Sequence, residues 1–136
     1  MAENKLAEIF SEHPAGVLST SDGQGNVNAA VFGSAKLVDP DHIVLGLGDN
    51  RTLANLQQNP NAVLLFYTLG RMVFDSRGAR LYLQLEDLEQ SGPLFTETVR
   101  DIEAKAGKMA ARSIIAVVRF KVSAVRPLID LHADEA

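Results

Sequence analysis

Apolar and polar residues alternate along much of the chain, a pattern typical of β-strands that bury one face. A first strand is predicted at residues 15–21, and the Gly- and Asn/Asp-rich residues 22–26 predict a tight hairpin turn. A long strand over residues 27–38 would follow. Its core face would be apolar or small throughout, with Val27, Ala29, Val31, Gly33, Ala35 and Leu37. Its other face would be mixed, with Asn28, Ala30, Phe32, Ser34 and Lys36.

The rest of the chain predicts further strands and a turn at residues 39–42. The strands are expected at residues 43–47, 61–69, 71–74, 79–86 and 113–125. The segment 61–69 is apolar on both faces, so both faces need a cover. Its two faces are Val63, Leu65 and Tyr67 on one side and Leu64 and Phe66 on the other.

Helical spacing predicts three short helices between these strands. They are expected over residues 3–12 up to His13-Pro14, from an N-cap at Asn50 to Asn59-Pro60, and from Gly92-Pro93 to about residue 106. The third would bury Phe95, Val99, Ile102 and Ala106. Because hairpins rather than crossover helices join the strands, we predict a mainly β fold, a small antiparallel β-barrel with capping helices.

Length and composition narrow the class of protein. The 136 residues, 46% apolar and 22% charged, fit a single globular domain over residues 1–136. The longest apolar run is about six residues, against the roughly 20 that span a bilayer, and no signal peptide is recognised, so we expect a cytoplasmic protein without a membrane partner.

Charge and cysteine content exclude further classes. A net charge of −4 disfavours a nucleic-acid partner, because binding a duplex needs a basic face. The absence of cysteine excludes disulfides, thiolate catalysis and cysteine-ligated metals. A small molecule or another protein is the expected partner.

The segment Gly-Leu-Gly-Asp-Asn-Arg-Thr at residues 46–52 is the best candidate for a binding site. Its glycines let a ligand approach the backbone, and the loop enters a helix whose free N–H groups favour an anion. Arg51 adds a charged fork for phosphate, and Thr52 adds a hydroxyl donor. The alternative is a plain strand–turn–helix with a solvated arginine.

Other candidate groups have simpler explanations. Gly33, inside a predicted strand, marks either a bend in the barrel or a place where something flat lies on the backbone. The histidines at 13, 42 and 132 are expected at the surface, and turn composition accounts for the group of Asp39, Asp41 and His42. We therefore predict no metal site, and no catalytic side chain is identified.

The order of these parts resembles the pyridoxamine 5′-phosphate oxidase-like, FMN-binding split-barrel family. The likeness covers about residues 13–127. It rests on His-Pro-Ala-Gly-Val-Leu-Ser-Thr from residue 13, Asp22-Gly23, Val-Asn-Ala-Ala-Val-Phe-Gly from residue 27, and Asp-Asn-Arg-Thr-Leu-Ala-Asn-Leu-Gln-Gln-Asn-Pro-Asn-Ala from residue 49. Ser-Gly-Pro-Leu-Phe from residue 91 and the strand from Ile114 are also similar to the smaller flavin-binding members.

The resemblance implies a six- to seven-stranded antiparallel split barrel of Greek-key type that binds FMN as a homodimer. Arg51 and Thr52, beside Asn50, would hold the phosphate, and Leu47 and Gly48 would pass beside the ribityl chain. The edge of the isoalloxazine would be lined by Ala30, Val31, Phe32, Gly33 and Ser34.

The end of the chain, from Ile129 to Ala136, departs from the oxidases that act on vitamin B6, because it lacks their basic residues. Pyridoxamine phosphate oxidase activity is therefore not expected. The hypothesis is an FMN-binding flavoprotein, an oxidoreductase or an electron carrier, with enzymatic activity left open. The alternative is a non-catalytic split-barrel module that carries haem, a deazaflavin or no cofactor.

Overall fold

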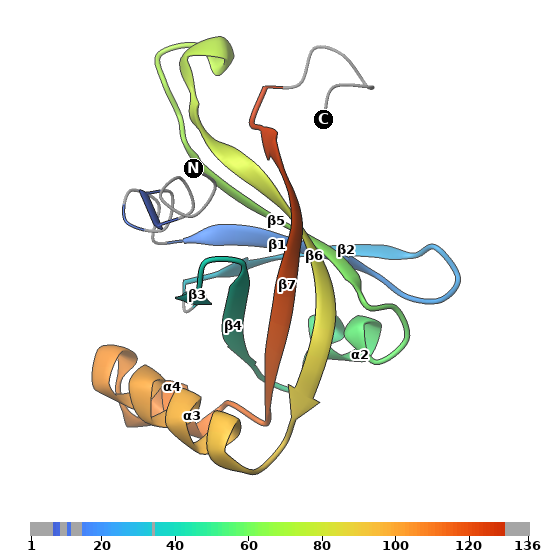
Figure 1. The fold of residues 1–136 in the computed structure, drawn as a ribbon, viewed down its shortest axis with the longest axis vertical. Helices are drawn as coiled ribbons and strands as arrows, with labels where there is room; N and C mark the ends of the chain where they lie inside the picture. The colour runs from blue at the N-terminus through green and yellow to red at the C-terminus, as the bar shows by residue number, and fades with distance from the viewer. Residues whose placement is uncertain (1–6, 9–10, 12–14, 34, 130–136) are drawn as a thin grey trace.

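The centre of the molecule is a seven-stranded antiparallel sheet (Figure 1). The computed structural model describes residues 7–8, 11, 15–33 and 35–129. The strands are β1 (Gly16–Ser21), β2 (Val27–Phe32), β3 (Lys36–Asp39), β4 (His42–Leu47), β5 (Asn61–Thr68), β6 (Arg77–Glu89) and β7 (Ala116–Pro127). They pair in the order β2-β1-β5-β6-β7-β4-β3. Among the described residues no pairing joins β2 to β3, so the barrel is split, and the predicted antiparallel split barrel is confirmed.

The first hairpin forms where the sequence predicts it. β1 and β2 pair from Gly16 opposite Phe32 to Ser21 opposite Val27. In the turn, Asp22 Oδ1 accepts hydrogen bonds from the amides of Gln24 and Asn26 at 2.8 and 3.0 Å. Gly25 adopts a φ of +86°, in the left-handed region that glycine enters at little cost.

The single strand predicted over residues 27–38 is wrong, because the chain breaks between β2 and β3. β2 pairs with β1 at one edge of the sheet, and β3 pairs with β4 at the other. The expected core face of β2 is also reversed, since Val27 and Val31 are 82% and 74% exposed while Phe32 packs on the core. Past the break, Ala35 and Leu37 return to the core. The break therefore resets the phase of the alternation by one residue.

The strand predicted at residues 71–74 is absent. This stretch is instead a turn that contains the 3-10 helix η1 (Val73–Asp75), at the tip of the β5–β6 hairpin. The tip is held by its own hydrogen bonds, from Gly70 N to Ser76 Oγ at 3.1 Å and from Asp75 N to Met72 O at 3.0 Å. Local bonds across the turn replace strand pairing here.

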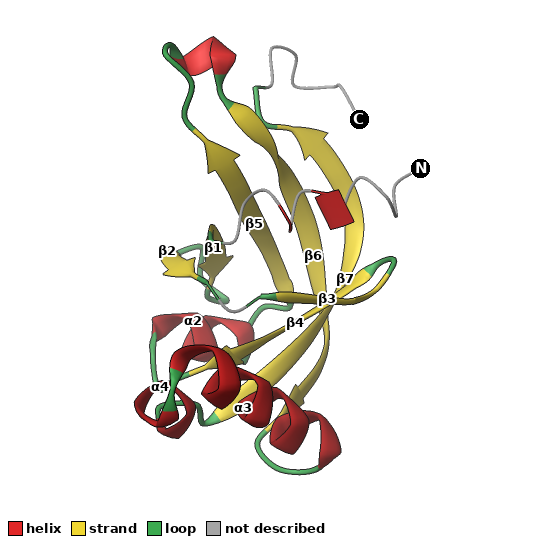
Figure 2. Ribbon diagram, turned by 90° about the vertical axis from the view of Figure 1, so that its left-hand side faces the viewer, coloured by secondary structure: helices red, strands yellow, loops and turns green. Residues whose placement is uncertain are grey.

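Three α-helices are described, and they gather at one end of the sheet (Figure 2). They are α2 (Arg51–Leu56), α3 (Pro93–Ala106) and α4 (Lys108–Arg112). The sequence predicts α2 and α3 but misses α4, which follows Gly107 at a φ of +94°, and β7 consequently begins at Ala116 rather than at residue 113. In α3, Ile102 is buried as predicted, but Ala106 is exposed. The helix predicted at residues 3–12 lies mostly outside the described residues, and its end at His13-Pro14 lies wholly outside them.

The main core lies inside the curled sheet. Its fully buried members come from β1, β4, β5, β6 and β7, and Leu53 and Leu56 of α2 close one side. A buried hydrogen bond from Asn55 Nδ2 to Thr20 Oγ1, at 3.0 Å, ties α2 to β1. This bond fixes the position of the helix on which the predicted phosphate site depends.

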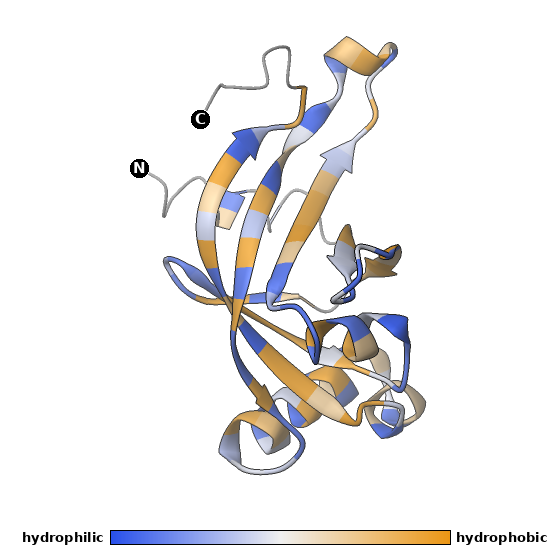
Figure 3. Ribbon diagram, turned by 90° about the vertical axis from the view of Figure 1, so that its right-hand side faces the viewer, coloured by the Kyte–Doolittle hydropathy of each residue, from blue (hydrophilic) through white to orange (hydrophobic). Residues whose placement is uncertain are grey.

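The opposite side of the sheet divides into two surfaces. On one, Val44 and Gly46 of β4 and Val117 of β7 lie beneath Ile102 of α3 and Ile114, and we call this the covered face. On the other, neighbouring strands place Val31, Val17 and Leu65 in one row, with Val27, Ala29 and Val63 nearby. We call these six residues the open face. Figure 3 shows how apolar positions recur along these strands and at the tip of the β5–β6 hairpin.

Candidate functional site

The loop after β4 leads directly into α2, and Asn50 caps this helix as predicted. Asn50 Oδ1 accepts a hydrogen bond from Leu53 N at 3.0 Å, and Asn50 has an extended backbone with φ −139° and ψ 177°. The Ala54 amide donates to Asn50 O at 3.2 Å. The cap fixes the direction of the first turn, so that Arg51 faces solvent and Thr52 faces inward.

Arg51 and Thr52 both have unused hydrogen-bonding groups. Thr52 is 1% exposed, and its Oγ1 is buried without a partner in the described part of the chain. A buried oxygen of this kind costs free energy unless a further group binds it. Arg51 forms no hydrogen bond or ion pair within the described ranges. Two adjacent residues at the start of α2 are therefore available to a ligand by their chemistry.

The surroundings of Arg51 carry one opposing charge. Asp22 lies across a hollow of about 370 Å³ that Arg51, Asn28 and Asn55 also line. The pKa of the Asp22 carboxyl is lowered, mainly by its hydrogen bond from Asn26 Nδ2 at 2.8 Å and to a smaller extent by the charge of Arg51. Asp22 therefore places a negative charge across the hollow from Arg51.

A cavity of about 1010 Å³ lies between the β3–β4 hairpin and the helices α3 and α4. Small-molecule sites typically occupy about 300–1,000 Å³, so this volume is ample for one. Four of the predicted flavin residues line the cavity: Phe32, Gly33, Gly48 and Asn50. The cavity thus connects the end of β2 with the loop after β4.

Other predicted residues face elsewhere. Val31 belongs to the open face, and Leu47 is fully buried in the core, where its carbonyl accepts a hydrogen bond from Ile115 N at 2.9 Å. Ala30 is half-buried and lines neither hollow, while Ser34 lies outside the described residues. The predicted set is contiguous along two neighbouring segments, but its side chains do not converge on one cavity.

The two predicted glycines differ in what surrounds them. A Cβ on Gly33 would meet no heavy atom within 4 Å, whereas a Cβ on Gly48 would lie 3.2 Å from Ser113 O. Packing therefore limits the side chain at Gly48 but leaves space beside Gly33. That space suits a flat ligand, and the position at the break between β2 and β3 also suits a simple bend.

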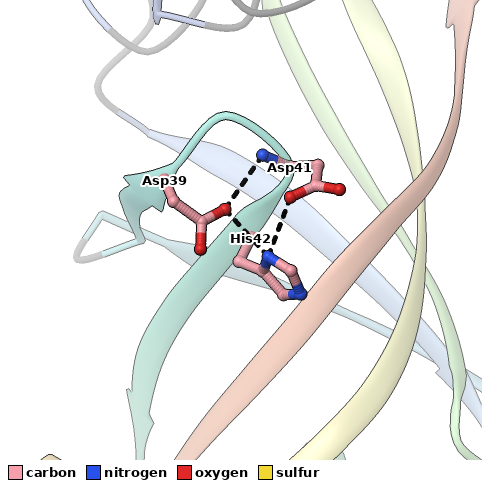
Figure 4. A group of neighbouring side chains, drawn as sticks. All are labelled: Asp39, Asp41 and His42. Carbon is pink, nitrogen blue, oxygen red and sulfur yellow. Dashed lines mark hydrogen bonds and ion pairs between the residues drawn. The ribbon is translucent and has the colours of Figure 1, made fainter.

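A separate polar cluster surrounds His42, at the turn between β3 and β4 (Figure 4). Its Nδ1 lies 2.8 Å from Asp39 Oδ1 and 2.9 Å from Asp41 Oδ1, and its Nε2 lies 2.9 Å from Glu86 Oε1. The hydrogen bond with Asp39 is the main cause that raises the pKa of His42, and it also lowers the pKa of Asp39. The imidazolium form, which donates from both nitrogens, is the form that these carboxylates favour.

Four members of the polar environment around the cavity and His42 are not predicted from the sequence. Glu86 reaches His42 because β6 has an irregular register between Leu85 and Asp87, opposite β7, and such a bulge redirects a side chain. Arg119 Nη2 lies 3.4 Å from Asp39 Oδ2, and Lys36 Nζ lies 3.0 Å from Asp101 Oδ2 on α3. Each contact joins residues far apart in the chain, so no short sequence pattern predicts it.

Comparisons with known proteins agree with this architecture. An FMN-binding protein of Syntrophomonas wolfei is 22% identical, with a TM-score of 0.81 over 96% of this chain and 88% of its own. A putative pyridoxamine 5′-phosphate oxidase of Listeria innocua is 18% identical, with a TM-score of 0.71 over 94% of this chain and 98% of its own. HutZ, the haem storage protein of Vibrio cholerae, is 15% identical, with a TM-score of 0.66 over 95% of this chain and 92% of its own. At these identities the likeness establishes the fold.

Three further findings complete these comparisons. Within the described residues no helix has the length and hydropathy needed to cross a membrane. None of the curated proteins compared with the chain matches it. The family model for pyridoxamine 5′-phosphate oxidase, in contrast, matches residues 2–130, nearly the full length, and the chain therefore belongs to that family.

Proposed function

We propose that the protein binds FMN and acts as a small flavoprotein, as an oxidoreductase or an electron carrier. The observation that carries this proposal is the start of α2, where Arg51 has no partner and the Thr52 hydroxyl is buried and unpaired among the described residues. A phosphate supplies the acceptors that these donors lack. The similarity to an FMN-binding protein and the family membership support the same cofactor.

In this proposal each segment has a separate role. Arg51 and Thr52 bind the phosphate, while Asn50 holds the helix start in position through its cap. The main chain at residues 30–34 lies along the edge of the isoalloxazine, and Leu47 and Gly48 lie beside the ribityl chain. FMN when bound supplies the electron-transfer chemistry, so the protein needs only to bind and orient it.

The haem alternative meets an obstacle at His42. Of the three histidines, only His42 falls in the part of the chain that the structure describes, and both of its ring nitrogens face carboxylates. Ligation of iron by His42 would require breaking at least one of these contacts. His13 and His132 lie outside the described residues.

The absorption spectrum of the purified protein tests the cofactor directly. We expect flavin bands, either in the protein as isolated or after incubation with FMN and removal of free flavin. A Soret band would support the haem alternative. Absence of both signals after reconstitution with FMN and with haem would leave the module without either cofactor and contradict the proposal.

We further propose that the protein is a homodimer joined through the open face, with FMN close to the interface. Val27 and Val31 are 82% and 74% exposed and lie beside Val17, Val63 and Leu65 on neighbouring strands. An apolar surface of this kind suits a two-fold interface, in which the same patch meets its copy. Val31 of the predicted flavin segment at residues 30–34 lies on this face, so dissociation should weaken flavin binding.

Sedimentation velocity over a range of concentrations tests the dimer. We expect a dimer at micromolar concentration and a parallel loss of FMN as the protein is diluted below its dimer dissociation constant. A monomer that retains FMN at full affinity would refute the shared site.

A further inference from the structure

We propose that the cavity between the β3–β4 hairpin and α3–α4 binds a small molecule with a flat apolar body and one carboxylate group. Arg119 would hold the carboxylate, and the apolar walls of the cavity would contact the body. The inference rests on the volume of the cavity, its apolar walls and the buried Nε of Arg119, which has no partner among the described residues.

The walls of the cavity are apolar and come from two layers. Leu37, Val44 and Gly46 line it from the β3–β4 hairpin, and Ile102 and Ile114 line it from the helical side. Gly46 allows close approach of the layers, because a Cβ there would lie 2.8 Å from Ile102 Cδ1 and 3.0 Å from Ile114 Cδ1. Walls of this kind, with a volume of about 1010 Å³, suit an apolar organic body.

The charged residues of the cavity fall into two groups. Lys36 is neutralised by Asp101 at 3.0 Å, and Asp39 is engaged by His42 at 2.8 Å. Among the described residues, Glu97 and Lys105 make no ion pair, and Arg119 pairs with Asp39 only at the longer distance of 3.4 Å. The lining charges balance, with three cations and three anions, so the unused donors of Arg119 and not a net charge would favour an anion.

Several N–H donors of Arg119 are not used in hydrogen bonds among the described residues. Its one contact within the described ranges is Nη2 to Asp39 Oδ2 at 3.4 Å, longer than the roughly 2.7–2.9 Å of a strong charged hydrogen bond. Its Nε is buried without a partner. A guanidinium presents five donors in a planar fork, and a carboxylate is the group that matches this fork with two parallel bonds.

Arg119 lies in one row with the other groups of the site. Across the paired strands, Lys36 is opposite Val44, and Val44 is opposite Arg119. A ligand in the cavity would therefore lie near both cations, of which Lys36 pairs closely with Asp101 at 3.0 Å and Arg119 more loosely with Asp39 at 3.4 Å. The cavity also includes Phe32, Gly33 and Gly48, so this ligand would lie beside the flavin, an assignment that rests on the proposed function.

The test uses 2-naphthoate and its uncharged analogue 2-naphthylmethanol, titrated into flavin-free protein by calorimetry. We expect both to bind, with naphthoate tighter. Arg119→Gln should weaken naphthoate roughly 10- to 100-fold, the loss expected for a charged hydrogen-bond donor, and should leave the alcohol unchanged. Arg100→Gln, at an exposed position of α3 outside the cavity, should leave both unchanged.

A cavity-filling variant checks the location. Thr98 lines the cavity from α3, and Thr98→Trp should abolish binding of both probes while circular dichroism stays native. Failure of naphthoate to bind the wild type, or an equal loss of both probes in Arg119→Gln, would overturn the proposal. Because the titration needs no FMN, such a failure is distinct from a failure of flavin binding.

Discussion

The covered face and the open face are similar in composition, yet only one is sealed by the described part of the chain. On the covered face, Val44 is 3% exposed and Val117 is fully buried, and Ile102 of α3 and Ile114 lie against Gly46, which neighbours both on this face. On the open face, Val31 is 74% exposed although it pairs with Val17 within a regular ladder. The two apolar strand faces therefore have different partners. A helix of the same chain covers one of them, and a second copy of the chain is proposed to cover the other.

The largest effect should follow from Ile102→Ala on the covered face. Ile102 of α3 is 7% exposed, and its side chain lies against Gly46 of β4. Truncation therefore leaves a cavity between the helix and the strand. We expect the free energy of unfolding to fall by about 2–5 kcal/mol, measured by urea denaturation. Val31→Ala on the open face is the matched control, and a loss as large as that of Ile102→Ala at a concentration where the protein is monomeric would contradict the distinction between the faces.

The next effect should come from Val31→Glu on the open face. Each subunit would place a carboxylate near the other's, and like charges facing each other cost several kcal/mol across an interface. We expect the dimer dissociation constant to rise by at least about 100-fold, measured by sedimentation equilibrium. Circular dichroism should stay native, and unchanged association would show that the open face is not the interface.

A smaller and more selective effect should follow from Arg51→Ala. If Arg51 holds the phosphate, FMN affinity should fall roughly 10- to 100-fold, because one charged hydrogen-bond donor is lost. Riboflavin, which lacks the phosphate, should bind as before. Flavin fluorescence quenching measures both affinities. Val31→Glu, in contrast, should weaken FMN and riboflavin alike, since it removes the partner rather than the anchor, and equal losses for both flavins in Arg51→Ala would make Arg51 structural.

The smallest effect concerns His42, which precedes Val44 and Gly46 in the alternation along β4 and links the β3–β4 turn to Glu86 of β6. Asp39 raises the pKa of His42, so the stabilisation is present below the unfolded value of about 6.5 and is lost as the pH rises through the folded value. Because the pKa of Asp39 is lowered, the stabilisation that this carboxylate contributes is present above about pH 4 and is lost in acid.

The stability difference between wild type and His42→Gln should therefore be greatest between about pH 4 and 6.5 and should shrink above that range. Denaturant titrations at a pH inside the range and at one well above it measure this difference. Lys121→Gln, at the exposed position that pairs with His42 on β7, serves as the control. A difference that is the same at both pH values would show that His42 acts through packing alone.

Local chemistry explains which parts of the fold the sequence predicts. The cap at Asn50 and the turn at Asp22 depend on side chains that bond to amides two to four residues away, so their patterns are visible in a short window. Both faces of residues 61–69 are apolar, and the need to cover them can likewise be predicted from this one segment. The start of the candidate site, at Arg51 and Thr52, is predictable for this reason.

Long-range choices explain the failures. The alternation in residues 27–38 runs unbroken through the sequence, and nothing local shows that β2 and β3 pair at opposite edges. The orientation of Phe32 therefore came out reversed. Glu86 becomes a partner of His42 only through the irregular register of β6 against β7, and Arg119 reaches Asp39 across 80 positions of the chain. These contacts arise only when the sheet has formed.

The break between β2 and β3 also has a consequence for the order in which the protein folds during synthesis. The β3–β4 hairpin joins the sheet only through β7, the last strand of the described chain. On the ribosome it must therefore wait for residues 116–127, which at about 5–20 residues per second takes several seconds. During that interval the edge of β4 is an unpaired template for other chains, so β7 is the strand that protects this edge of the nascent protein from aggregation.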